Sequence, residues 1–209
     1  MTTLLVTGFG PFPGAPYNPT GPLVARLARL RRPALEGITI VPHVFTTSYA
    51  AVDKELPALI AHHKPDALLM FGLAARAKWV RIETRARNAL AMLPDATSAS
   101  LRRQVIAPGG PASLAMPAQT RHLLAAARHA RVPVKLSRDA GRYLCNYLCW
   151  SAADVVARAQ GPRLAAFVHV PPVSRTPRRR RADTATFTLD ELTRAGARIL
   201  VAMAAAARR

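Results

Sequence analysis

The sequence has few cysteines, few acidic residues and few aromatic residues. Each of these low counts argues for or against particular classes of protein. Cys145 and Cys149 are its two cysteines, too few for the disulfide framework of a small secreted protein, so we expect a reducing, cytoplasmic compartment. No basic-then-apolar leader opens the chain and no apolar run is long enough to cross a bilayer, so we expect no membrane partner. Hydrophobic residues make up 50% of the chain, as in a folded globule.

The charge is strongly one-sided, with 30 basic residues against 11 acidic ones and a net charge of +19. This excess favours contact with polyanions, so a non-catalytic, Arg-rich nucleic-acid-binding protein is one hypothesis. The basic residues are spread over most of the chain, however, with one dense run at Arg178–Arg181. Aromatic residues make up 6% of the chain and offer little material for base stacking. We therefore interpret most of the charge as a solvated surface.

Short apolar runs alternate with segments of helical spacing. The predicted strands are 3–7, 38–45, 66–71, 79–83, 132–137 and 164–170, and the predicted helices are one from Pro22, 48–63 with a break at Pro57, 119–131, 145–160 and 188–208. Thr188 and Glu191 form a capping box for the last helix. Residues 84–117 are predicted to be a loop, and residues 174–187 a basic loop. The alternation predicts a single α/β domain over residues 1–209, with a mostly parallel sheet covered on both faces.

Residues with reactive side chains follow several of the predicted strands. Phe9 and Phe12 follow the first strand, Glu83 ends the fourth, Cys145 follows the fifth, and His169 closes the sixth. In sheets of this kind the site lies at the carboxyl ends of the strands. We therefore expect a thiol, an imidazole and a carboxylate at one edge of the sheet, which is the set of groups that a cysteine hydrolase needs.

Each of these residues also has a structural interpretation. Cys145 begins a predicted helix, where unpaired N–H groups favour a thiolate, although most lone cysteines are small buried hydrophobes. His169 fits a core histidine, and Glu83 could pair with a nearby arginine. Cys149 could be a resolving thiol or a metal ligand, but no further ligands have a recognisable spacing, so we expect core packing and no metal or cofactor.

The loop after the first strand, Gly8–Gly14, resembles the start of a dinucleotide-binding fingerprint. Pro11 and Pro13 interrupt the turn, the third glycine comes one position too late, and no acidic residue ends the second strand. These differences exclude a dinucleotide site. Two phenylalanines on a rigid loop suit the wall of a pocket for a small flat substrate better.

Four segments, in this order, resemble the pyroglutamyl peptidase I family, the pyrrolidone-carboxylate peptidases. They are Val6–Phe12 with Asn18–Thr20, Ile82–Asn88, Ala140–Asn146 and Phe167–Pro171. The resemblance runs over roughly residues 3–173. It implies cysteine peptidases that remove an N-terminal pyroglutamate, fold as a three-layer α/β/α sandwich with a mostly parallel or mixed sheet, are cytosolic, often form dimers or tetramers, and need no metal.

The resemblance also implies roles for individual residues. Cys145 would be the nucleophile, His169 the general base and then acid, and Glu83 the residue that orients the imidazole. Phe9, Phe12 and Asn18 would bind the substrate, a peptide with a blocked N-terminus, and the phenylalanines would line the pocket for the lactam ring. A thioacyl-enzyme would form on the thiol.

The chain departs from the family pattern between Gly72 and Glu83. The family usually has a longer loop there, with a Gly-Gln and a Gly-Gly-Arg pattern, whereas this chain has a shorter one, Leu73–Ile82, without the glutamine. The same thiol chemistry on a different cyclic or blocked amide is therefore an alternative function.

Overall fold

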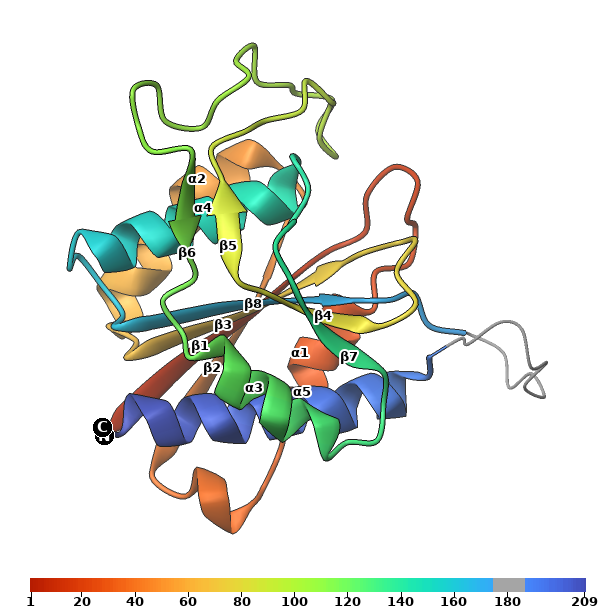
Figure 1. Ribbon diagram of the computed structural model, residues 1–209, viewed down its shortest axis with the longest axis vertical. Helices are drawn as coiled ribbons and strands as arrows, with labels where there is room; N and C mark the ends of the chain where they lie inside the picture. The colour runs from red at the N-terminus through yellow and green to blue at the C-terminus, as the bar shows by residue number, and fades with distance from the viewer. Residues whose placement is uncertain (175–186) are drawn as a thin grey trace.

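A six-stranded mixed sheet lies at the centre of the computed structural model, which describes residues 1–174 and 187–209 (Figure 1). The strands, in the order β2-β1-β3-β8-β4-β7, are β2 (Ile38–Phe45), β1 (Thr2–Phe9), β3 (Ala67–Leu73), β8 (Leu164–Val170), β4 (Val80–Glu83) and β7 (Val134–Ser137). The first four of these are parallel to one another. Strand β4 runs antiparallel to β8 and parallel to β7. The basic run Arg178–Arg181, and with it most of the predicted loop over 174–187, lies outside the described residues.

Helices cover both faces of this sheet. Helices α1 (Thr20–Ala28), α3 (Thr120–Arg128) and α5 (Leu189–Ala207) lie on one face, and α2 (Tyr49–His63) and α4 (Leu144–Ala157) lie on the other (Figure 1). A short 3₁₀ helix, η1 (Pro33–Leu35), precedes β2. This arrangement confirms the predicted three-layer α/β/α sandwich.

Alternation along the strands separates two apolar cores. In β1, Leu4 and Val6 pack with α1 and α5, whereas Leu5 packs with α2 and α4. In β8, Val168 belongs to the first core and Phe167 to the second. Because successive side chains on a strand point to opposite faces, His169 shares the face of Phe167, which is the face covered by α4.

Several predicted elements are confirmed, and the predicted break at Pro57 is wrong. Strands β2 and β8 have the predicted bounds, and Thr188 and Glu191 form the capping box of α5. Pro57, however, does not interrupt α2, which runs unbroken past it. Pro57 is exposed, and the buried residues Val52, Leu56 and Ile60 hold the helix against the sheet on both sides of it. Packing therefore outweighs the missing proline N–H.

The segment predicted to be a loop over residues 84–117 contains a second, two-stranded sheet. Its strands are β5 (Arg85–Arg87) and β6 (Ser113–Ala115), which pair antiparallel. Figure 1 shows this sheet beside α4. Strands of three residues are too short for alternation to predict them. None of the described helices has the length and apolarity needed to cross a membrane.

Candidate active site

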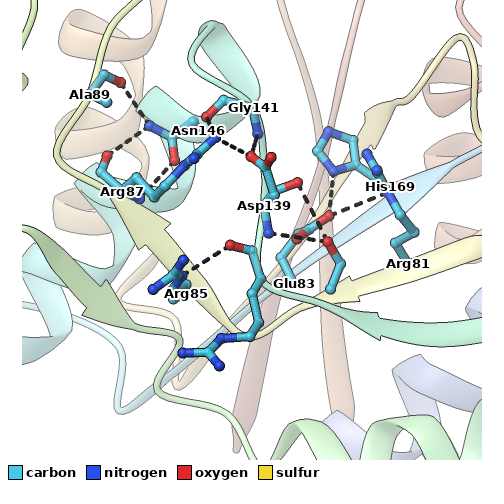
Figure 2. A network of polar contacts seen from close by, with 11 residues as sticks. Arg81, Glu83, Arg85, Arg87, Ala89, Asp139, Gly141, Asn146 and His169 are labelled. Atoms are coloured by element: carbon cyan, nitrogen blue, oxygen red, sulfur yellow. Dashed lines mark hydrogen bonds and ion pairs between the residues drawn. The ribbon is translucent and has the colours of Figure 1, made fainter.

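His169 and Glu83 form a buried pair at the centre of the site. The imidazole Nδ1 donates a hydrogen bond to Oε1 of Glu83 at 2.8 Å, and both side chains are almost fully buried (Figure 2). A carboxylate is an acceptor, so this contact fixes the proton on Nδ1 and leaves Nε2 for another partner. The pairing therefore sets the tautomer of the imidazole.

The direction of β4 corrects the reason for expecting Glu83 at this edge. Carboxyl ends meet when strands are parallel, but β4 runs antiparallel to β8, so that Glu83 lies opposite Phe167 and Arg81 lies opposite His169. All four side chains share one face of the sheet. Glu83 reaches the imidazole diagonally, from two residues along the strand pair, a contact that antiparallel pairing permits. The expected residues meet for a different geometric reason.

Cys145 is the second residue of α4. Residues 138–143 lead to it from β7, and Gly141 takes a positive φ of 85°, a conformation that costs glycine little. The N-cap residue, Tyr143, makes no side-chain capping hydrogen bond within the described part of the chain. The first-turn N–H groups and the positive end of the helix dipole therefore act on the thiol and on any ligand bound to it.

The thiol lies against the end of β3, over Gly72. A Cβ atom added at Gly72 would come within 2.8 Å of Cys145 Sγ and 2.6 Å of Phe167 Cζ. Gly72 is the strand partner of His169, and the Phe167 ring packs edge-on against the imidazole with centroids 5.0 Å apart. The missing side chain at Gly72 thus makes the space in which the thiol approaches the imidazole. A glycine that closes a buried apolar run marks this position in the sequence, but nothing local to it indicates that the thiol lies above it.

The electrostatics couple the thiol to the imidazole. Burial alone would lower the pKa of His169, but the charge of Cys145, a hydrogen bond with the Cys145 side chain and the contact with Glu83 raise the pKa to about 9. Cys149 differs, because burial, with the charges of Cys145 and Glu83, raises the pKa of its thiol well above the usual value. Cys149 is fully buried in the α4 core. Of the two cysteines, Cys145 is the one in a position to react.

A small pocket opens beside Cys145. It has a volume of about 50 Å³ and is lined by residues of four segments: Phe9, Phe12, Asn18, Thr47, Leu73, Tyr143, Leu144 and Cys145. The three residues expected to bind substrate therefore line the same pocket as the thiol. Leu73, the residue after Gly72, gives this pocket an apolar wall.

Asn18 shapes the pocket through the loop that carries the phenylalanines. Its Nδ2 donates to the carbonyl of Gly10 at 3.0 Å, and its Oδ1 accepts from Thr20 Oγ1 at 2.8 Å. Thr47 Oγ1 donates to the same Gly10 carbonyl at 2.9 Å. Thr20 Oγ1 also accepts from the N–H of Phe9 at 2.9 Å. These bonds fix the loop, so the polar atoms of Asn18 are engaged in positioning it.

Asn146, next to Cys145, ties the nucleophile's helix to the small outer sheet. Its Oδ1 accepts from the N–H of Arg87 at 2.9 Å, and its Nδ2 donates to the carbonyls of Arg87 and Ala89 at 2.8 and 3.0 Å (Figure 2). The side chain is fully buried. Asn146 lies within the Ala140–Asn146 motif, but its function could not be predicted, because its three backbone partners lie far away in the sequence.

The site contains no evident metal centre in the described residues, where no group of three or more His, Cys, Asp or Glu side chains is placed to hold an ion. A thiol at a helix N-terminus, a coupled imidazole and a buried carboxylate, set on an α/β/α sandwich, define a cysteine hydrolase.

Comparison with known proteins gives the family. The model of the pyroglutamyl peptidase family matches residues 2–208, and the chain belongs to that family. It is 32% identical over 178 residues to the pyrrolidone-carboxylate peptidase of Deinococcus radiodurans, covering 82% of this chain and 78% of the relative. The structure is similar to that of pyroglutamyl peptidase I from Bacillus amyloliquefaciens, with a TM-score of 0.83 and 27% identity over 98% of both chains. It is also similar to pyrrolidone carboxyl peptidase from Fervidobacterium islandicum, with a TM-score of 0.86 and 25% identity over 97% of this chain and 98% of that one.

Proposed function

We propose that this protein is a cysteine peptidase that hydrolyses the amide bond after an N-terminal pyroglutamyl residue. The observation that carries the proposal is the His169–Glu83 hydrogen bond of 2.8 Å beside a thiol coupled to the same imidazole. Family membership supports the choice of a pyroglutamyl substrate. Cys145 acts as nucleophile, His169 as general base and acid, and Glu83 as the residue that orients His169.

In the acylation step, the Cys145 thiolate attacks the carbonyl carbon of the amide bond that follows the pyroglutamyl ring. The carbonyl oxygen becomes an oxyanion, which the first-turn N–H groups of α4 stabilise. His169, which carries the proton taken from the thiol, gives that proton to the departing amine as the C–N bond breaks. A thioester between Cys145 and the pyroglutamyl group remains.

In the deacylation step, neutral His169 takes a proton from a water molecule that attacks the thioester carbonyl. The C–S bond breaks, free pyroglutamate leaves, and the proton returns to the Cys145–His169 pair. Glu83 keeps the Nδ1 proton of His169 in place through both steps, so that Nε2 is the nitrogen that transfers protons.

The pocket suits a small flat ring. Phe9 and Phe12 supply aromatic walls, and the loop that carries them is fixed by the hydrogen bonds of Asn18 and Thr47. Leu73 adds an apolar wall, and the loop that it begins lacks the glutamine of the family pattern. This observation favours a second candidate, the same hydrolysis of a less polar cyclic or blocked amide, because an apolar wall offers no hydrogen bond to a lactam.

Release of a fluorescent amine from pyroglutamyl, prolyl and N-acetyl amides tests the proposal. We expect the pyroglutamyl amide to have the highest kcat/KM, and Cys145→Ser and His169→Ala to lower it by about 10⁴-fold. Cys149→Ala is the matched control and should keep the wild-type rate. A higher kcat/KM on one of the other amides would favour the second candidate, and full activity of Cys145→Ser would refute the nucleophile.

A further inference from the structure

Arg81 is an arginine beside the His169–Glu83 pair that the reaction described above does not use. It lies directly opposite His169 in the β4–β8 strand pair. Its Nε is 3.6 Å from Oε1 of Glu83, the same oxygen that accepts the hydrogen bond of His169 (Figure 2). Arg81 and His169 therefore share one carboxylate oxygen.

The carboxylate of Glu83 is buried with few partners. Its side chain has no exposed surface, and among the described residues its Oε2 makes no hydrogen bond. The Nε of Arg81 is buried too and makes none within that part of the chain, so its contact with Glu83 is one of charge. A buried charge is costly unless an opposite charge lies near it, and here the nearby groups are Arg81 and His169.

The positive charge of Arg81 is permanent, whereas that of His169 is not. Arginine stays protonated at any pH at which the protein is folded, whereas His169 must become neutral to act as a base. Within the described part of the chain, Arg81 is the cation that stays paired with Glu83 when His169 is neutral. Among the described residues, Tyr143 and Cys149 also interact electrostatically with the thiol, and neither supplies a positive charge.

We propose that Arg81 is a positioning residue, whose guanidinium compensates the buried charge of Glu83 whenever His169 is neutral and so keeps the carboxylate ionised and hydrogen-bonded to the imidazole. Arg81 acts through Glu83 on His169 and Cys145. The inference rests on the proposed function only in that His169 changes its charge during turnover.

The test is the pH dependence of Cys145 alkylation by iodoacetamide, measured by peptide mass mapping. A fixed positive charge near Glu83, His169 and Cys145 disfavours the protonated form of each of these coupled groups. Removal of that charge therefore raises the pH at which the thiol of Cys145 loses its proton and becomes reactive. We expect Arg81→Gln to raise the midpoint of alkylation by about one pH unit. Arg81→Lys, which keeps the charge, should stay near the wild-type midpoint.

Arg85→Gln is the matched control. It removes the same charge from the next strand, where the Arg85 Nε donates to the carbonyl of Arg138 at 3.0 Å (Figure 2). Its midpoint should equal that of the wild type. An unchanged midpoint in Arg81→Gln, or an equal shift in Arg85→Gln or Arg81→Lys, would overturn the proposal. The Lys variant keeps the test decisive if Arg81→Gln fails to fold.

Hydrolysis supplies the second readout. With a pyroglutamyl amide, Arg81→Gln should lower kcat by about tenfold and leave KM within twofold, because the lost contact acts on the reacting groups. A rise in KM at constant kcat would overturn the positioning role. If the wild type turned over no pyroglutamyl amide while the alkylation midpoints moved as expected, the substrate assignment would fail and the role of Arg81 would stand.

Discussion

Gly72→Ala tests whether the missing side chain at the end of β3 makes the space for the thiol. The added Cβ would lie 2.8 Å from Cys145 Sγ and 2.6 Å from Phe167 Cζ. To reach an ordinary contact of about 3.5 Å, the sulfur must move by roughly 0.7 Å and the ring by roughly 0.9 Å. Phe167, on β8, is fully buried in the core that α4 covers, so it has little room to move, and the thiol is the group expected to yield.

The expected magnitudes follow from this displacement. A misplacement of about 1 Å at a reacting group costs about 100-fold in rate, so kcat/KM of the pyroglutamyl amide should fall by that factor. Overpacking of a buried site should also lower the free energy of unfolding by about 1–3 kcal/mol. The assays are steady-state kinetics, the rate of Cys145 alkylation and urea denaturation.

Gly21→Ala is the control for Gly72→Ala. Gly21 lies in α1, where the added Cβ would meet Val44 at 3.8 Å, an ordinary contact. Activity should be unchanged and stability equal or higher by up to about 1 kcal/mol, because alanine favours helix. Activity of Gly72→Ala within threefold of the wild type would refute the steric reasoning.

Four further predictions concern residues in and beside the site. Asn146→Ala removes three buried hydrogen bonds to Arg87 and Ala89 and should lower the free energy of unfolding by about 2–4 kcal/mol, measured by urea denaturation; a loss under 0.5 kcal/mol would contradict the anchoring role. NMR should place the pKa of His169 near 9 in the wild type and lower in Cys145→Ala, because the charge of Cys145 raises it; an unchanged value would count against the coupling. Since that pKa is raised from 6.5, its stabilisation is complete below pH 6.5 and lost as the pH rises through about 9, so the urea midpoint should fall less over this range in Cys145→Ala than in the wild type. Iodoacetamide at pH 7 should label Cys145 in the folded protein and Cys149 only after denaturation, and equal labelling in the folded state would contradict the burial of Cys149.

Helices and strands whose signals lie within a few neighbouring residues could be predicted from the sequence. The apolar run of β8 and the capping box of α5 have local causes, so their bounds agree with the structure. The continuity of α2 through Pro57 depends on packing against the sheet, which no local pattern contains. Strands β5 and β6 are too short for periodicity to reveal them.

The candidate site was predictable in its membership but not in its geometry. Residue type and family resemblance together singled out Cys145, His169 and Glu83. Strand direction is decided by tertiary pairing, so the sequence could not reveal that Glu83 reaches His169 from an antiparallel strand. The roles of Gly72 and Arg81 depend on which side chains face them across the sheet, and those neighbours lie far away in the sequence.

The position of β8 in the sheet has a consequence for how the protein is made. Strand β8 comes last of the six strands in the chain, yet it lies between β3 and β4 and joins the two halves of the sheet. The same strand brings His169 to Glu83, which precedes it by 86 residues. On a translating ribosome, β4 and β7 would have to wait for β8 before they could join the rest of the sheet. The sheet and the His169–Glu83 pair are therefore completed by the same strand. Until β8 has been synthesised and paired, the growing chain lacks the imidazole of the proposed site.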